Sequence, residues 1–193
     1  MPVDEGMALY EAALLGGARG PLLEVGSYCG KSAVYLGAAA RARSTVVFSI
    51  DHHRGSEEHQ PGEEYHDPAL RDEAGRVDTL PEFRRTIARA GLDDVVIGII
   101  GSSPVVASQW GTPLGLVFID GSHSQSAADA DLDGWSPWVV SGGLLAIHDV
   151  FEDPSDGGRP PYEIFRRALG SGAFKEAGQC RSLRVLERVR DDL

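Results

Sequence analysis

The sequence predicts an α/β protein with a doubly wound sheet of seven strands, mostly parallel, that ends in an antiparallel hairpin. Short, nearly continuous apolar runs alternate with helical patterns along the chain, which is typical of a parallel sheet covered on both faces. The last two predicted strands, Phe174–Gln179 and Leu183–Glu187, are joined by a short turn of the kind that connects antiparallel strands. A length of 193 residues favours one domain.

The parallel strands and the helices between them are predicted in order along the chain. The strands are Leu22–Val25, Val46–Ile50, Val95–Ile100, Leu116–Ile119 and Gly143–Ile147. The helices are the Ala-rich Lys31–Arg43, Pro81–Ala90, a short helix opening at Ser103-Pro104, Ser124–Gly134 and Pro161–Leu169. Pro81 at a helix start and Gly91 just past its end follow the usual asymmetry, and Ser124 is a plausible N-cap. Together these elements indicate a Rossmann-like arrangement.

Composition excludes several classes of partner. The chain has 18 Lys and Arg against 29 Asp and Glu, a formal charge of −11, so we expect neither nucleic acid nor a membrane as partner. Cys29 and Cys180 are too few for a disulfide framework. No apolar run approaches the roughly 20 residues of a membrane span, and the acidic N-terminus lacks a signal-peptide pattern. We therefore expect a cytoplasmic protein.

Residues 52–80 interrupt the regular alternation of strands and helices. This segment is long for a βα connection and carries eight acidic residues against three Arg. One interpretation is a solvated surface loop. The other is a lid or substrate loop at the end of the second strand, in which His52 and His53 face the substrate.

Polar and acidic residues follow the carboxyl ends of the strands, where open α/β sheets bind ligands. Gly26 and Gly30 bracket a tight turn before a helix, whose free N–H groups suit a ligand. Asp51 ends the second strand, where an acid can hold the ribose hydroxyls of a nucleoside. The Gly30-Lys31-Ser32 segment is also similar to a phosphate-binding P-loop, but three residues rather than four separate the glycines. Because of the remaining similarity at Gly30-Lys31-Ser32, a P-loop-like NTPase is kept as an alternative despite the different spacing.

Two carboxylates have a geometry compatible with a shared cation, apart from any family. Asp120 and Asp149 follow the fourth and fifth strands, which we expect to be neighbours about 4.8 Å apart. Their carboxylates are therefore close enough to share a cation, and oxygen ligands suit Mg²⁺. The alternative role for these two acids is helix capping and loop hydrogen bonding.

The segment from Leu22 to Ala33, LLEVGSYCGKSA, resembles motif I of class I S-adenosylmethionine-dependent methyltransferases. It is especially similar to the small metal-dependent O-methyltransferases of the catechol and bacterial sugar types. The resemblance extends over VFIDGSH at 117–123, GGLLAIHD at 142–149 and the terminal hairpin. It implies that residues 1–193 form a single methyltransferase domain.

The resemblance implies a role for each matching residue. Cofactor binding is expected for Glu24, Gly26, Ser27, Tyr28, Gly30, Ser32, Asp51, Ser102, Ser103 and Asp120. Asp120, His148 and Asp149 occupy the positions of the metal ligands, and His123 occupies that of the general base. The position of His148 is usually acidic in the family, so either it ligates a softer metal than Mg²⁺ or it acts as a second catalytic base.

The expected function is metal-assisted transfer of a methyl group from S-adenosylmethionine to a saccharide hydroxyl, such as that of a mannoside or a glycosylated natural product. A phenol or catechol is the alternative acceptor. A non-catalytic nucleoside-binding module is an alternative of another class. The expected partner is thus a small-molecule or oligosaccharide acceptor, and the resemblance also implies a homodimer, for which the apolar helix at 1–15 is a plausible docking element.

Overall fold

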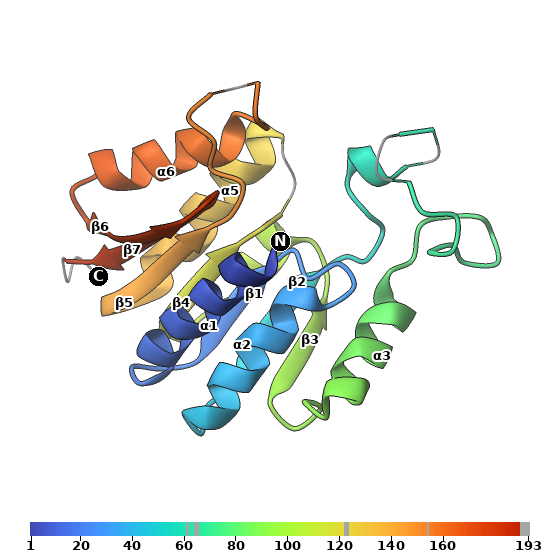
Figure 1. The fold of residues 1–193 in the computed structure, drawn as a ribbon, viewed down its shortest axis with the longest axis horizontal. Coiled ribbons are helices and arrows are strands. Elements are labelled where there is room, and N and C mark those ends of the chain that lie inside the picture. Colours follow the sequence, from blue (N-terminus) through green and yellow to red (C-terminus); the bar gives the residue numbers. More distant parts are fainter. Residues whose placement is uncertain (61, 64–65, 122–123, 154, 190–193) are drawn as a thin grey trace.

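The computed structural model describes residues 1–60, 62–63, 66–121, 124–153 and 155–189. Within these residues, seven strands form one sheet in the order β3-β2-β1-β4-β5-β7-β6 (Figure 1). The strands are β1 Leu22–Val25, β2 Val47–Asp51, β3 Val96–Ile100, β4 Leu114–Ile119, β5 Val139–Ile147, β6 Phe174–Cys180 and β7 Leu183–Arg188. β1 to β5 pair in parallel, whereas β7 runs antiparallel to both β5 and β6. The predicted fold class is confirmed.

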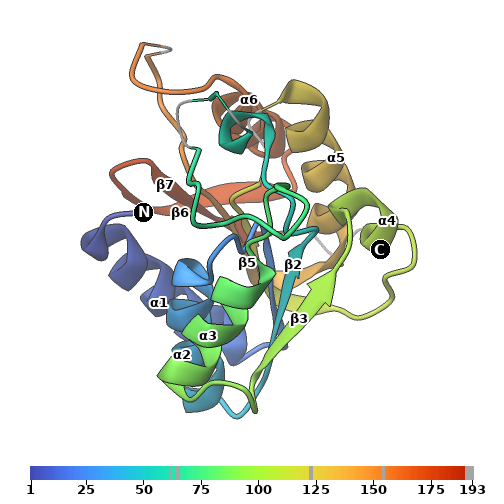
Figure 2. The same cartoon turned by 90° about the vertical axis from the view of Figure 1, so that its right-hand side faces the viewer.

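Helices cover both faces of the sheet (Figures 1 and 2). The helices are α1 Val3–Gly17, α2 Lys31–Ala42, α3 Leu80–Ala90, α4 Ser103–Ala107, α5 Gln125–Trp135 and α6 Pro160–Gly170, with 3₁₀ turns η1 Glu57–His59 and η2 Ser136–Trp138. Successive strand residues point to opposite faces, so Leu22 joins the core under α1, α2 and α3, and Leu23 joins the core under α5 and α6. Both predicted helix ends are confirmed, because Ser124 accepts from the Ala127 N–H and Gly91 has a φ of 65°.

Helix α1 packs against its own chain. Leu9, Ala12 and Ala13 are buried in the core shared with α2, and Gly6 lies against the Tyr35 ring, where a Cβ would approach within 2.4 Å. The apolar face expected to dock a second copy is therefore largely covered, although Val3, Met7 and Leu15 remain exposed.

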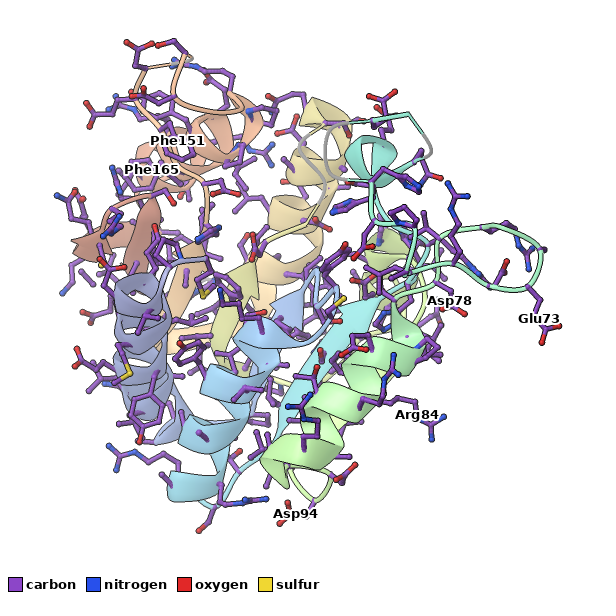
Figure 3. The ribbon with its side chains drawn as sticks, turned by 45° about the vertical axis from the view of Figure 1, so that its right-hand side comes forward. Glu73, Asp78, Arg84, Asp94, Phe151 and Phe165 are labelled. Carbon is purple, nitrogen blue, oxygen red and sulfur yellow. The ribbon has the colours of Figure 1, made fainter. Side chains whose placement is uncertain are left out.

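The segment at 52–80 has local order where the structure describes it. Its far end is a turn in which Asp72 pairs with Arg54 and Arg76 and accepts backbone N–H groups. The backbone N–H of Arg76, followed by its side chain and the Ala74 N–H, lowers the pKa of Asp72 to about 2. Glu73 lies at the tip of this turn, away from the sheet (Figure 3). The end nearer β2, by contrast, turns back over the carboxyl edge of the sheet, where Ser56 and His59 reach the cleft described below.

Among the described residues, no helix combines the length and the hydropathy needed to cross a membrane.

Candidate active site

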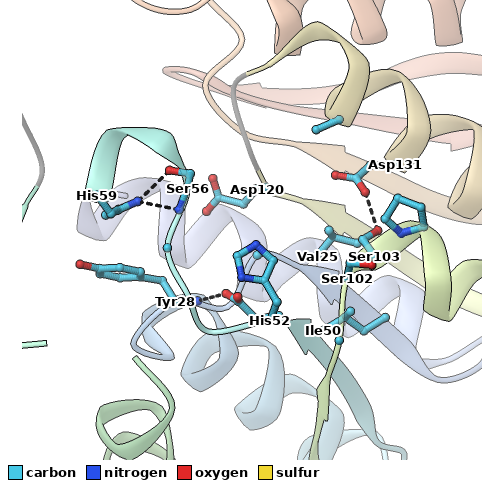
Figure 4. Close-up of a pocket in the computed structure, with 17 residues that line it drawn as sticks. Val25, Tyr28, Ile50, His52, Ser56, His59, Ser102, Ser103, Asp120 and Asp131 are labelled. Atoms are coloured by element: carbon cyan, nitrogen blue, oxygen red, sulfur yellow. Dashed lines mark hydrogen bonds between the residues drawn. The ribbon is translucent and has the colours of Figure 1, made fainter. Parts of the chain in front are cut away.

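Two cavities open at the carboxyl ends of β1, β2, β4 and β5. The first, drawn in Figure 4, extends from Tyr28 and Asp51 to Ser103 and Asp131. The second lies towards the loop after β5 and is lined by Ser27, Lys31, Asp149 and Phe151, among others. Both are lined by Gly26, Tyr28, Ser56, His59, Asp120 and Gly121. Because they share these walls, the two cavities form one cleft with Asp120 at the junction.

The turn after β1 brings the backbone close to this junction. Gly26 has a φ of 90°, and a Cβ at this position would lie 2.1 Å from the Asp120 carbonyl oxygen. Gly30 has a φ of 87°, and Tyr28 also adopts a left-handed conformation with a φ of 45°. Only glycine fits position 26, which explains the predicted turn. Ser27 is 2% exposed and lines the second cavity, and its buried hydroxyl has no hydrogen-bond partner among the described residues.

Asp51 lies at the end of β2, as predicted, and lines the first cavity. Its two carboxylate oxygens accept the backbone N–H groups of Tyr28 and His53, each at 2.7 Å. A carboxylate oxygen accepts more than one hydrogen bond, so Asp51 can hold these loops and still accept from a ligand hydroxyl.

Glu24 lies below the cleft rather than in it. This residue of β1 is fully buried and accepts hydrogen bonds from the Ser32 and Ser49 hydroxyls. Burial raises the pKa of Glu24 to about 7, although both hydroxyl bonds act in the opposite direction. The structure therefore does not bring Glu24 into contact with the cavities, and Glu24 instead fixes the start of α2 to β2.

The buried carboxyl of Glu24 makes stability depend on pH. Its pKa rises from 4.5 to about 7 on folding, so the stability from the neutral form is complete below pH 4.5 and lost as the pH rises to 7. We expect Glu24→Gln to match wild type near pH 4.5 and to exceed it by up to about 3 kcal/mol above pH 7. Urea denaturation at both pH values measures this difference. An advantage that does not change with pH would contradict the account.

Ser102 and Ser103 both line the first cavity, as expected for residues that border a bound base. The Ser103 hydroxyl donates to Asp131 on α5 and accepts from the Trp135 indole N–H at 2.7 Å. These bonds join the start of α4 to α5 and place the Asp131 carboxyl on the cavity wall (Figure 4).

Asp120, His148 and Asp149 come together as predicted. The Nδ1 atom of His148 lies 3.2 Å from Asp120 Oδ1 and 3.1 Å from Asp149 Oδ1. One potential ligand atom from each of the three lies within 4.8 Å of the others. Asp149 has a φ of 56°, which is uncommon for a residue other than glycine and indicates that the surroundings hold it in place. The cluster lies where β4 and β5 end side by side.

Glu5 of α1 holds the other side of the His148 ring. Its Oε2 lies 2.9 Å from His148 Nε2, while its Oε1 accepts the Ser182 N–H at 2.9 Å and the Ser182 hydroxyl at 2.7 Å. Glu5 is 1% exposed and His148 is 5% exposed. Although burial alone would raise the pKa of Glu5, the bonds from His148 and Ser182 lower it below its usual value. Glu5 is therefore an ionised acceptor for the Nε2–H of His148.

This arrangement fits a divalent cation. A histidine ligand commonly donates its second N–H to a carboxylate, as His148 does to Glu5. Its Nδ1 atom is buried and makes no hydrogen bond of adequate geometry among the described residues, yet it faces two carboxylates. One nitrogen and two carboxylate oxygens form a donor set for a cation such as Mn²⁺ or Mg²⁺. Without a cation, burial lowers the pKa of His148, but Asp120 and Asp149 outweigh it and raise the value to about 11.

The remaining predicted histidines have different surroundings. His52 lines the first cavity. His53 is 2% exposed, bonds through Nδ1 to the Thr79 hydroxyl at 2.8 Å and packs on Phe83, so the structure does not bring it into the cleft. His123, the predicted general base, lies outside the described residues.

Sequence reasoning missed three residues of this site. Nothing in the sequence connects Glu5 with His148, because an acid in the first turn of a helix is common. Asp131, by contrast, lies on the helix stripe of Ala128, Leu132 and Trp135, and an acid on an apolar stripe is a detectable signal. The ring of His59 lies 4.7 Å from that of Tyr28 at the cleft. Because His59 lies in the long polar segment, no regular pattern in the sequence indicated that it would reach the cleft.

Comparisons with known proteins agree with this geometry. A family model described as a methyltransferase domain (Methyltransf_24) matches residues 23–150. The O-methyltransferase NovP has a TM-score of 0.71 and 17% identity, covering 97% of this chain and 81% of its own. TomG from Streptomyces achromogenes, an O-methyltransferase of tomaymycin synthesis solved with S-adenosylmethionine, has a TM-score of 0.67 and 13% identity, covering 98% and 82%.

An rRNA methylase from Streptococcus thermophilus is also similar, with a TM-score of 0.62 and 11% identity, covering 95% of both chains. At these identities the solved structures establish the fold, and their differing acceptors do not transfer to this chain. The family model, however, spans more than half of the chain. The chain therefore belongs to this methyltransferase family, and the resemblance to class I methyltransferases predicted from its sequence is confirmed.

Proposed function

We propose that this protein is an S-adenosylmethionine-dependent O-methyltransferase that acts on a saccharide hydroxyl with the help of a divalent cation. The observation that carries the proposal is the position of Asp120, which lines both cavities and also belongs to the cluster with His148 and Asp149. A donor in the first cavity and an acceptor in the second would thus meet beside a metal-type donor set.

The residues of the first cavity suit the nucleoside part of the donor. Asp51 offers carboxylate oxygens to the ribose hydroxyls, and Gly26 and Asp120 line the same cavity. In the second cavity, the unpartnered hydroxyl of Ser27 suits the polar end of the methionine part. S-adenosylmethionine supplies a sulfonium methyl group, which the acceptor oxygen takes as the carbon–sulfur bond breaks.

Asp120, His148 and Asp149 would hold the cation, with Glu5 fixing the His148 ring. A cation held by these three residues would lower the pKa of an acceptor hydroxyl and orient it. The structure argues against the alternative role of His148 as a second base. Its Nε2 is bonded to Glu5 and its Nδ1 lies between two carboxylates, so neither nitrogen is open to an acceptor.

The general base stays as predicted from the sequence. His123 follows Asp120 by three positions, and an unperturbed imidazole pKa near 6.5 suits removal of the hydroxyl proton. We expect His123→Ala to lower turnover by about 10²–10⁴-fold while S-adenosylhomocysteine still binds. Single-turnover rates and calorimetric titration separate the two effects. Turnover close to that of wild type would exclude His123 as the base.

The second cavity suits a polyhydroxyl acceptor. It combines the rings of Tyr28 and Phe151 with the charged groups of Lys31 and Asp156, so it offers both stacking faces and hydrogen-bonding groups. Sugars use both, because one face of the ring is apolar and the hydroxyl groups are polar. A phenol remains the second acceptor, since Tyr28 and Phe151 suit an aromatic ring equally well. We further propose that residues 52–80 act as a lid, because Ser56 and His59 line both cavities.

Calorimetric titration with S-adenosylmethionine, S-adenosylhomocysteine and ATP tests the proposal against its alternatives. We expect micromolar binding of the first two and no binding of ATP. ATP binding without the others would support the NTPase interpretation of the turn at 26–32. Cofactor binding without transfer to any acceptor of a saccharide and phenol panel would support a non-catalytic module.

A further inference from the structure

Asp131 is a buried carboxyl for which the chemistry above has no use. It lies on α5, is 4% exposed, and its Oδ1 accepts from the Ser103 hydroxyl. Burial raises the pKa of Asp131 to about 6, while the bond from Ser103 acts in the opposite direction. The carboxyl is therefore mostly ionised above neutral pH. An ionised carboxylate at such a depth costs free energy unless a donor stabilises it.

The surroundings of Asp131 suit a flat, apolar ring with one polar edge. The same end of the first cavity is lined by the aliphatic side chains of Val25, Ile50, Pro104 and Ala127. Figure 4 shows the Asp131 carboxyl beside Ser103 on the wall of this cavity, on the side away from Tyr28. The bond from Ser103 leaves the carboxylate able to accept further hydrogen bonds. A ligand in this part of the cavity therefore faces a group that accepts hydrogen bonds and donates none.

This inference rests on the proposed function. If the ribose is held at Asp51, the purine base would reach the part of the cavity that Ser103 and Asp131 line. We propose that the Asp131 carboxylate accepts a hydrogen bond from the exocyclic amino group of the adenine and thereby selects adenine over purines with a 6-oxo group. Ser103 and Trp135 are then positioning residues, because their chain of hydrogen bonds fixes the carboxylate.

The test compares two ligands that differ at this one position. S-adenosyl-L-homocysteine carries a 6-amino group, whereas S-inosyl-L-homocysteine carries a 6-oxo group and no donor there. We expect the wild-type protein to bind the adenosyl ligand at least about 10-fold more tightly by calorimetry, because the oxo group would face the carboxylate. Asp131→Asn places an amide there that can donate to the oxo group. We expect the ratio of the two affinities to fall towards one in this variant.

The ratio separates base recognition from a structural role. If Asp131 only joins α5 to α4, Asp131→Asn weakens both ligands equally, the ratio stays at its wild-type value, and the inference is overturned. Asp133→Asn is the matched control, since Asp133 lies on the same helix but is exposed and pairs with Arg167. We expect that control to keep both affinities and the ratio of wild type.

Two further outcomes keep the inference distinct from the proposed function. If Asp131→Asn does not fold, the wild-type protein alone decides, because equal affinity for the adenosyl and inosyl ligands contradicts selection at the 6-position. If the wild-type protein binds neither ligand, the proposed function fails and this inference fails with it. Binding of the adenosyl ligand with an unchanged ratio in Asp131→Asn overturns the inference alone.

Discussion

Asp149→Asn is expected to lower methyl transfer by at least about 100-fold and to leave the affinity for S-adenosylhomocysteine close to that of wild type. The substitution removes one negative oxygen from the proposed cation site and changes little else. Asparagine adopts left-handed backbone conformations readily, so the φ of 56° at this position is retained. The loss corresponds to the several kcal/mol that a bound cation contributes to a charged transition state.

The control for this variant removes a carboxylate elsewhere. Asp94 pairs with Arg41 near the start of β3, at the opposite end of the strand from the cleft, so we expect Asp94→Asn to keep wild-type turnover. Steady-state rates with and without added Mg²⁺ or Mn²⁺ provide the measurement. Should Asp149→Asn retain full, cation-dependent turnover, Asp149 is not a ligand.

Glu5→Gln is expected to weaken the binding of Mn²⁺ by about 10- to 100-fold, the usual effect of losing a carboxylate behind a histidine ligand. Glu5 accepts from the Ser182 backbone N–H and from His148 Nε2. A glutamine has only one acceptor atom, and the backbone N–H cannot change direction. The amide oxygen therefore faces Ser182, and its NH₂ group faces Nε2. This reverses the His148 tautomer, so that Nδ1 carries the proton and cannot ligate.

Metal affinity is measured directly by electron paramagnetic resonance of free Mn²⁺, so the result does not depend on turnover. Ser182→Ala is the matched control, because it removes one donor to Glu5 but leaves the bond to His148. We expect this control to bind Mn²⁺ within a few-fold of wild type. A Glu5→Gln protein with unchanged Mn²⁺ affinity would show that Glu5 does not set the orientation of His148.

The sequence predicted the sheet because its evidence is local. Each parallel strand is a short apolar run followed by a glycine or a polar residue, and some of the helices carry a start or stop signal, such as Ser124 or Gly91. Strand bounds were less accurate. β5 begins at Val139 rather than Gly143, since Gly142 and Gly143 weaken the strand pattern although both lie within the strand.

The candidate site could be predicted only where sequence order determines position. Asp120 and Asp149 follow adjacent parallel strands, so their meeting follows from the topology. The contact between Glu5 and His148 joins the first helix to the fifth strand through tertiary packing alone, and no pattern in the sequence encodes it. Glu24 is the opposite case, in which a residue of the family motif lies outside the cleft. It lies within the family motif, but its position inside β1 directs its side chain into the core.

Transfer of a labelled methyl group from S-adenosylmethionine to saccharide and phenol acceptors, with Mg²⁺ or Mn²⁺ and after chelation, tests the central claim most directly. The account predicts a methylated saccharide hydroxyl, formed only with the cation present and restored when the cation is added back. Transfer that continues unchanged in the chelated protein would contradict the role assigned to Asp120, His148 and Asp149.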